Sequence, residues 1–157
     1  MTRLFSIVLA LAFLVLPPAA AWGQGTEAFE TGPLAIETAG GKVEFTVEMA
    51  MTSAQRAQGL MYRRKMALDA GMLFDNGRTQ PAAMWMKNTF IPLDMLFIAE
   101  DGRIVRIAER TVPQSLAVVG SGEPVRGVLE LKGGSAARLG IKPGDRVLHE
   151  IFGTAPP

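Results

Sequence analysis

The sequence contains no cysteine and only one histidine, His149. Without cysteine no disulfide can form, so the hydrophobic core has to hold the fold together. The same absence excludes a lipid-modified cysteine at the N-terminus. A zinc site takes three or four Cys, His or carboxylate ligands, so a histidine-rich or structural zinc site is excluded as well. We therefore expect neither a metal nor a cofactor.

Several catalytic and nucleotide-binding motifs are also missing. The chain has no nucleophile elbow, no phosphate loop and no dinucleotide-binding glycine fingerprint. Its glycine pairs, Gly40–Gly41 and Gly133–Gly134, lack the residues that would have to follow them. His149 could serve as a base, but a lone histidine in a terminal strand is more often a solvated or hydrogen-bonded surface residue. We assign no catalytic residue from these patterns.

The first residues have the layout of a secretory signal peptide. Arg3 precedes an apolar run from Leu4 to Leu16, and two prolines and then Ala19–Ala21 follow it. The run is too short to span a bilayer as a helix, so we expect no stable membrane insertion. The pattern predicts cleavage after residue 21, or as late as residue 23, and export to the periplasm.

Removal of the signal peptide leaves roughly 135 residues, the size of one domain. The mature chain carries 15 basic and 15 acidic residues, because Arg3 leaves with the signal peptide. Bulk charge thus gives no support to a polyanion partner, and we expect no nucleic-acid binding. We expect a monomer with a flexible leader (residues 22–32), a single β-rich domain (33–153) and a short tail (154–157).

Short alternating apolar runs predict a chain made mainly of strands. Residues 43–49 alternate apolar and polar side chains, and a Gly40–Gly41 turn separates them from a strand at residues 34–38. The dipeptide Asn76–Gly77 predicts a turn after a third strand. The third strand is expected at residues 71–74, and later strands at 84–87, 94–99, 104–107, 128–131 and 146–152. Residues 108–125 are expected to form a long surface loop, with or without one edge strand.

Two short helices interrupt these strands. Thr52 and Gln55 form a capping box, which predicts a helix from there to about Tyr62. A second helix is expected at residues 135–139, ended by Gly140. The sequence thus predicts an α+β, β-rich domain: a mostly antiparallel sheet curled into a barrel-like shape with two short helices.

The order of several motifs resembles the domain-of-unknown-function 192 family. The motifs are GLMYR at 59–63, GMLF at 71–74, WMKNT at 85–89, IPLD at 91–94, VLEL at 128–131 and GIKPGDRV at 140–147. Together they span nearly all of the mature chain. The resemblance implies a small exported or cytoplasmic domain with a barrel-like α+β fold, and it implies no activity. Many members have cysteines and a tyrosine around residues 113–125, and this chain lacks them.

The densest apolar block of the exported part runs from Met84 to Ile98, yet polar residues interrupt it. We interpret it as two core strands joined by a tight connection at residues 87–92. The candidate binding residues are the polar residues of this block, the tryptophan on the same predicted strand face as Lys87, and two weaker candidates from other apolar runs: Lys87, Asn88, Thr89, Asp94, Trp85, Arg63 and Glu130. An indole for stacking beside fixed charged groups is typical of a concave binding site.

A purely structural role for the same residues remains open. In that alternative, Asp94 accepts hydrogen bonds from backbone amides of the turn, Lys87 pairs with Asp94 or Glu130, and Trp85 covers the core. Met84 and Met86 share a strand face, and thioethers select Cu(I). Methionine is also a common core filler, so we expect no copper role.

The sequence favours an exported binding module for a small polar ligand or an envelope component. One alternative is a hydrolase that uses Asp94 and Glu130 as paired carboxylates, as in glycoside hydrolysis. Another is a scaffold or interaction module without a small-molecule site. The sequence does not name the ligand.

Overall fold

The computed structural model describes residues 26–155 of the chain. The predicted signal peptide and the start of the predicted leader lie outside the described residues. The described elements are β1 (Glu30–Thr38), β2 (Gly41–Ala50), α1 (Ser53–Gln58), β3 (Ala70–Met84), β4 (Leu93–Ile98), β5 (Ile104–Thr111), β6 (Val119–Lys132), α2 (Ser135–Leu139), β7 (Arg146–Leu148) and a 3-10 turn (Glu150–Phe152). None of the helices found there is both long and apolar enough to cross a membrane.

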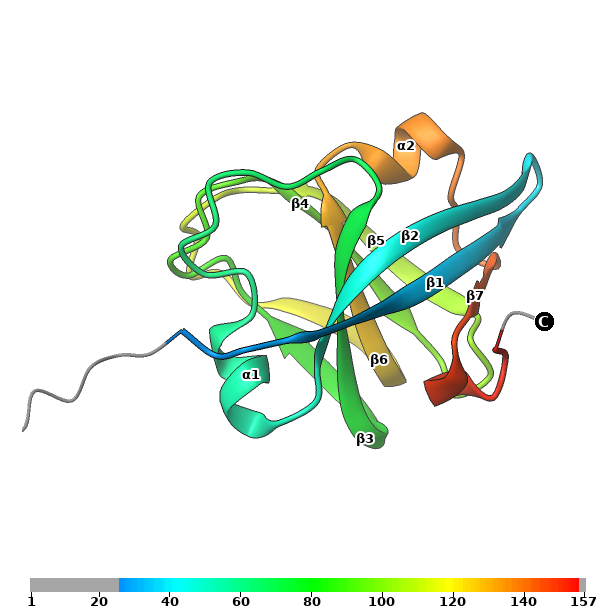
Figure 1. Ribbon diagram of the computed structural model, residues 1–157, viewed down its shortest axis with the longest axis horizontal. Helices are drawn as coiled ribbons and strands as arrows, with labels where there is room; N and C mark the ends of the chain where they lie inside the picture. The colour runs from blue at the N-terminus through cyan, green and yellow to red at the C-terminus, as the bar shows by residue number, and fades with distance from the viewer. Residues whose placement is uncertain (1–25, 156–157) are drawn as a thin grey trace, which may run out of the picture.

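The strands form one sheet in the order β5-β4-β6-β3-β2-β1-β7. The β2–β3 pair is parallel and the other pairs are antiparallel. The sheet curls, so that its two edges meet where Arg103 bridges Arg146 (Figure 1). This confirms the predicted fold class, a mostly antiparallel, barrel-like sheet with two short helices.

Two hydrophobic clusters lie on the two faces of this sheet. The first draws on every strand, including Ile104 of β5 and Val147 of β7 at the two edges, and so fills the inside of the curl. The second lies on the outer face of β3, β6 and β4, where Met72 and Met95 belong to it. Leu60 and Met86, from the loops after α1 and β3, cover this outer cluster. The space between the outer face and its covering loops is where a site can form.

The predicted capping box starts α1 as expected. Thr52 Oγ1 accepts from the Gln55 amide at 3.1 Å, and Gln55 Oε1 accepts from the Thr52 amide at 2.9 Å. The helix ends at Gln58, earlier than predicted, because Gly59 leaves the helical conformation with φ of 48°. A Cβ at Gly59 would lie 3.1 Å from the Phe74 ring, so glycine also permits the close approach to β3.

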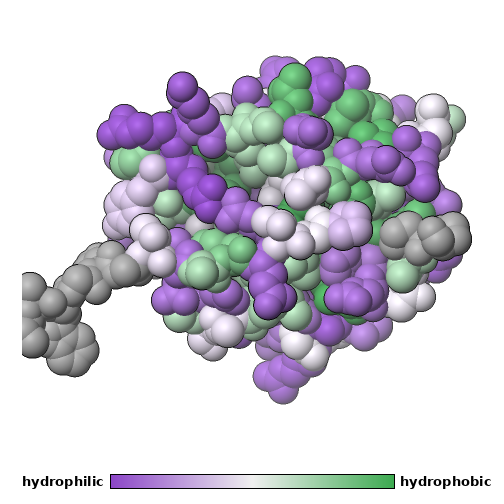
Figure 2. Space-filling model, in the orientation of Figure 1, coloured by the Kyte–Doolittle hydropathy of each residue, from purple (hydrophilic) through white to green (hydrophobic). Residues whose placement is uncertain are grey.

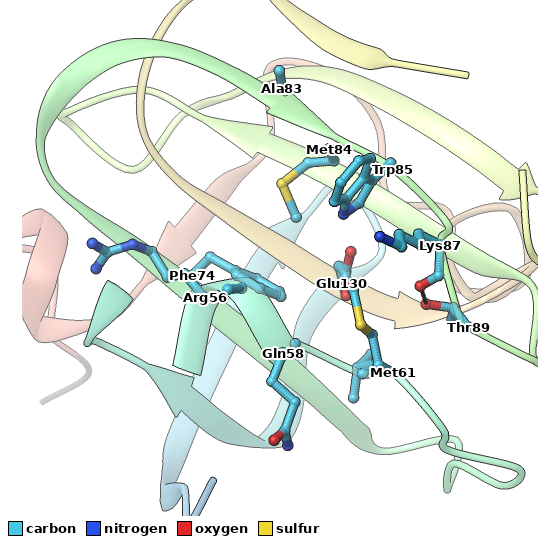
Figure 3. A pocket seen from close by; sticks show the side chains of 13 residues that line it. Arg56, Gln58, Met61, Phe74, Ala83, Met84, Trp85, Lys87, Thr89 and Glu130 are labelled. Atoms are coloured by element: carbon cyan, nitrogen blue, oxygen red, sulfur yellow. Dashed lines mark hydrogen bonds between the residues drawn. The ribbon is translucent and has the colours of Figure 1, made fainter. Parts of the chain in front are cut away.

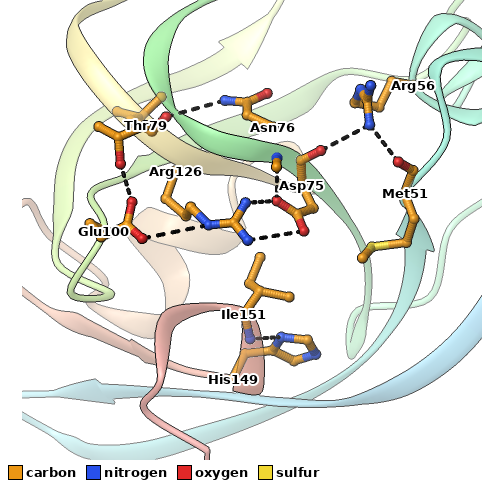
Figure 4. A network of polar contacts seen from close by, with 11 residues as sticks. Met51, Arg56, Asp75, Asn76, Thr79, Glu100, Arg126, His149 and Ile151 are labelled. Carbon is orange, nitrogen blue, oxygen red and sulfur yellow. Dashed lines mark hydrogen bonds and ion pairs between the residues drawn. The ribbon is translucent and has the colours of Figure 1, made fainter.

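The Asn76–Gly77 dipeptide does not end a strand, as predicted, but lies inside the long strand β3. Asp75 accepts from the Gly77 amide at 2.7 Å, and its carboxylate pairs with Arg126 of the neighbouring β6 (Figure 4). The register between β3 and β6 shifts over this stretch. The turn at Asn76–Gly77 is therefore a local irregularity in the β3–β6 ladder, which continues on both sides of it.

Three other predicted segments have different bounds in the structure. The predicted loop at 108–125 is largely strand, because β5 runs to Thr111 and β6 begins at Val119. β1 begins at Glu30, inside the predicted leader, because it pairs with β2 as far as Met49. The last strand, β7, ends at Leu148, and His149 then caps the 3-10 turn as its Nδ1 accepts from Ile151 at 3.3 Å.

The predicted strand at residues 84–87 is also wrong, because β3 ends at Met84 and residues 85–92 form a loop. The Met86 amide donates to Ser115 and the Thr89 amide donates back to Met86, which turns the chain away from the ladder. The predicted alternation of buried and exposed side chains is still present over residues 85–87. Met86 is buried, whereas Trp85 and Lys87 face outward.

Candidate functional site

A recess of about 80 Å³ lies on the outer face of β3 and β6, beneath α1 and the loop that follows β3 (Figure 3). Trp85 and Lys87 stand at one side of it, with Met61 and Met84 close by and Glu130 in the middle. Larger hollows of about 370, 410 and 360 Å³ lie along β1 and β2. The first two have no buried polar or charged side chain in their lining, and the third has only His149, whose Nδ1 atom already accepts from the Ile151 amide. The recess is therefore the best candidate for a site with chemistry of its own.

Glu130 is an acid placed among apolar side chains. It lies opposite Met72 of β3 and Met95 of β4, both fully buried, and is itself 4% exposed. Among the residues that the structure describes, no hydrogen bond or ion pair reaches its carboxyl group. Burial raises the pKa of Glu130 to about 8, because the charged form loses its hydration. At neutral pH the group is protonated and can donate a hydrogen bond into the recess.

Trp85 and Lys87 form the exposed side of the recess. The indole is 49% exposed, and the Lys87 Nζ atom lies 5.2 Å from the centre of its ring. Figure 3 shows the Lys87 ammonium and the Glu130 carboxyl group facing the same space. They are more than 4 Å apart, since no ion pair within the described range joins them. The ammonium is thus available to a ligand.

Replacing Lys87 by alanine should change the free energy of unfolding by less than about 0.5 kcal/mol. The side chain is exposed and touches the protein mainly where its ammonium lies over the half-exposed Trp85 ring, so little packing is lost. Equilibrium denaturation beside the parent protein measures this difference. A loss above about 1 kcal/mol would mean that Lys87 has a structural ion-pair role.

The backbone beside the recess is strained at three places. Tyr62, Asn88 and Gln114 have φ values of 65°, 55° and 61°, a region that residues other than glycine seldom occupy. They lie in three different loops, and hydrogen bonds join these loops, as between the Tyr62 amide and the Asn88 carbonyl at 2.8 Å. Strained backbone clusters at functional sites, which agrees with a site at this end of the molecule.

The structure brings together only some of the predicted site residues. Trp85, Lys87, Thr89 and Glu130 line the recess. Asn88 lies next to them and donates to the Tyr62 hydroxyl at 3.1 Å. Arg63 is not in the recess, because its guanidinium pairs with Glu48 of β2 at 2.5 Å.

Asp94 lies elsewhere and has a structural role. Its Oδ1 atom accepts from the amides of Arg110 at 2.8 Å and Gly134 at 2.9 Å, and its Oδ2 atom accepts from Ala136 at 2.8 Å. It thereby caps α2, whose N-cap residue, Gly134, has no side chain to do so. The structural alternative predicted that Asp94 accepts from backbone amides, and it does. However, these amides belong to β5 and to the start of α2, and not to the turn before Asp94.

The paired-carboxylate hypothesis is wrong for geometric reasons. In the β4–β6 ladder Met95 lies opposite Glu130, and Asp94 lies opposite Leu131. Residues opposite each other share a face and successive residues alternate, so Asp94 and Glu130 point to opposite faces of the sheet. They cannot flank one substrate bond.

The sequence prediction did not include Met61 and Met84 in the site, although both line the recess. The motif that contains Gly59 to Arg63 was the available signal, because it marks the chain segment that covers the outer face. Met84 and Met86 were predicted to share a strand face, but β3 ends at Met84 and Met86 lies in the loop. Met84 lines the recess, whereas Met86 is buried and accepts from the Thr111 hydroxyl at 3.0 Å. Over residues 26–155, no group of three or more His, Cys, Asp or Glu side chains could hold a metal ion.

Comparisons with known proteins agree with this fold. A family profile, DUF192, described as "Uncharacterized ACR", matches residues 35–149. A crystal structure from Sinorhizobium meliloti 1021, described as a "putative transcription regulator", is 54% identical, covers 78% of this chain and 96% of its own, and has a TM-score of 0.76. A protein of unknown function from Novosphingobium aromaticivorans DSM 12444 is 39% identical, covers 85% and 93%, and has a TM-score of 0.74. No curated protein matches the chain.

Proposed function

The chain belongs to the DUF192 family, and we propose that it is a binding module that holds a small polar ligand in the recess between Trp85, Lys87 and Glu130. The observation that carries this proposal is the buried carboxyl group of Glu130, which faces the recess without a protein partner. Among the described residues no fully buried side-chain oxygen or nitrogen lacks a hydrogen-bond partner, so the Glu130 oxygens are open to the recess. Their partner therefore has to come from the recess itself, either as water or as a ligand group that displaces that water.

The charge of the recess favours a ligand group that accepts hydrogen bonds. At neutral pH the protonated Glu130 offers an O–H donor, and Lys87 adds a positive charge. The guanidinium of Arg56, which also borders the recess, already donates to the carbonyls of Met51 and Asp75 (Figure 4). A carboxylate or carbonyl group thus fits the donors that remain.

The size of the recess limits what it can hold. Sites for drug-sized ligands span roughly 300 to 1,000 Å³, whereas this recess spans about 80 Å³. It accommodates a group of a few heavy atoms, either a small molecule or the polar end of a larger one. The exposed Trp85 indole can stack on the remainder of a larger ligand.

We infer that this binding takes place outside the cytoplasm, with the chain acting as a monomer. The layout of residues 1–21 as a signal peptide supports export. An envelope component that presents a carboxylate or carbonyl group would fit the recess as a ligand.

A thermal-shift screen of small carboxylates, carbonyl compounds and amines tests the proposal. A ligand at about 100 times its Kd should stabilise the protein by about 2.7 kcal/mol. The stabilisation should be absent in Glu130→Met, which fills the same space without polar atoms. It should persist in Glu130→Gln, whose amide still donates. It should also weaken between pH 6 and pH 9 for carboxylates, as Glu130 ionises and repels them.

Two outcomes would contradict the proposal. Ligands that stabilise Glu130→Met as much as the parent protein bind somewhere else. Carboxylates whose affinity rises with pH would mean that Glu130 acts as an anion toward a cationic group.

A further inference from the structure

Three loops gather at one end of the molecule, and we name this surface the loop end. They are residues 59–69 after α1, 85–92 after β3 and 112–118 after β5. Backbone hydrogen bonds tie them together: the Tyr62 amide donates to Asn88, the Gln114 amide to Thr89, and the Met86 amide to Ser115. In Figure 1 they lie together on the left, away from β7 and the C-terminus. The loop end is therefore one connected surface.

Large apolar side chains project from the loop end. Val112, Leu116 and Val118 are 69%, 68% and 71% exposed, and Tyr62 and Trp85 are about half exposed. Val119 pairs with Met84 in the last step of the β3–β6 ladder, so Val118 and Trp85 are the first residues beyond that ladder. Such residues occur singly on most proteins, but here they share three bonded loops, and clusters of this kind mark interaction surfaces.

The loop end is also positively charged. Arg64, Lys65 and Lys87 are exposed there, and Arg63 adds a fourth cation that pairs with Glu48. Asp69 is the one carboxylate within the three loops. The mature chain as a whole carries equal numbers of basic and acidic residues, so this excess is local. Figure 2 shows hydrophilic side chains projecting from the upper left of this face, over the loops.

We propose that the loop end is a docking surface for a lipid bilayer that carries anionic headgroups. Basic side chains beside exposed aliphatic and aromatic ones are the combination that holds proteins at such a surface. Tyr62 and Trp85 have the amphipathic rings that favour the membrane–water interface. The contact is peripheral, with the loop tips entering the headgroup region while the sheet stays in water.

Other occupants fit the loop end less well. A second copy of this chain in a two-fold contact would bring two equally basic surfaces together. Single-stranded nucleic acid would use the cations and the aromatic rings, but Val112, Leu116 and Val118 could neither stack on bases nor bond phosphate. A bilayer contacts the basic, the aliphatic and the aromatic side chains of the loop end together.

Trp85 provides a local reporter for the test. The chain has two tryptophans, Trp22 and Trp85, so Trp22→Phe leaves the indole at the loop end as the sole one. The exported form of this variant, recovered from cells, is titrated with vesicles of phosphatidylglycerol and phosphatidylcholine, and separately with pure phosphatidylcholine. We expect the fluorescence of Trp85 to shift to the blue, and to be quenched by brominated lipid, with the anionic vesicles only.

Paired variants separate local charge from total charge. Each basic residue near an anionic surface contributes about fivefold in affinity. Arg64→Ala with Lys65→Ala should therefore weaken vesicle binding about 25-fold. The matched control, Lys42→Ala with Lys142→Ala, removes the same charge from exposed positions at the start of β2 and after α2, and should change binding little. Leu116→Ser with Val118→Ser should abolish the blue shift, and denaturation shows that each variant is folded.

Several results would overturn the docking proposal. They are equal binding to neutral vesicles, an equal loss in the control pair, or no change at Trp85 with either vesicle. Self-association that Leu116→Ser and Val118→Ser abolish would assign the surface to a second copy. Tighter binding to an oligonucleotide than to vesicles would assign it to nucleic acid. The loop end shares Trp85 and Lys87 with the recess, but the test of the recess depends on Glu130, so either proposal can fail while the other stands.

Discussion

Replacing Glu130 by glutamine is expected to increase the free energy of unfolding at pH 8 by about 3 kcal/mol, a large gain for one substitution. The pKa of this carboxyl group rises from the ordinary 4.5 to about 8 on folding. One pKa unit corresponds to about 1.4 kcal/mol, so the full shift sets an upper limit near 5 kcal/mol. The glutamine amide needs hydrogen-bond partners of its own in the same apolar place, so we expect less than that limit. Glutamine has the same shape and no proton to lose.

The pH dependence has a definite sign. Between pH 4.5 and about 8 the unfolded chain releases the Glu130 proton while the folded chain keeps it. The unfolded state then binds fewer protons, so stability falls as the pH rises through this window and levels off above it. The glutamine variant should lack this slope and match the parent protein near pH 4. Urea denaturation across pH 4 to 9 measures both effects.

An exposed carboxylate provides the control for this prediction. Glu44 lies on β2 with its side chain exposed to water. Glu44→Gln should therefore leave the stability and its dependence on pH unchanged. If Glu130→Gln instead destabilises the protein at pH 8, the carboxylate has a favourable partner in the folded state. The recess would then be a structural feature and no longer a ligand site.

Replacing Asp94 by alanine should have the opposite effect and lower the free energy of unfolding by about 4 kcal/mol. The fully buried carboxylate accepts from three backbone amides, those of Arg110, Gly134 and Ala136. Each buried amide left without a partner costs about 1 to 3 kcal/mol. Because α2 has no cap of its own, its first turn should loosen as well.

Asp94→Asn distinguishes this effect from a general failure to fold. The amide oxygen still accepts, while the NH₂ group faces amide donors, so we expect a loss of about 2 kcal/mol. Asp101→Ala is the matched control, because this exposed carboxylate accepts from the Arg103 amide alone and should cost less than about 1 kcal/mol. Guanidinium denaturation compares the three variants. An undiminished midpoint for Asp94→Ala would refute the structural role and return this residue to the candidate site.

Local sequence signals predicted the local elements well. The capping box at Thr52, the helix before Gly140 and the hairpins around residues 39–42 and 100–103 depend on neighbours in the chain. The full lengths of β3 and β6 could not be predicted, because long-range pairing carries both strands through residues that favour turns, such as Gly77 and Pro124. Tertiary pairing there overrides local preference.

The candidate site was predicted in part for a similar reason. Alternation showed that Asp94 and Glu130 interrupt apolar strands, but not the register between those strands. The register alone decides that Asp94 lies on the inner face and Glu130 on the outer one. Likewise, the motif around Trp85 and Lys87 marked them as candidates. The sequence did not show that a loop, and not a strand, carries them over Glu130.

The state of Glu130 is the most direct test of the proposed site. An NMR titration that follows the side-chain carboxyl carbon of Glu130 in the folded protein measures its pKa without any ligand. A midpoint near 8 is the expected result, because the group is buried and lacks a protein partner. A midpoint at the ordinary value of 4.5 would show a carboxylate that is hydrated or paired with Lys87, and would contradict a recess that is held ready for a ligand.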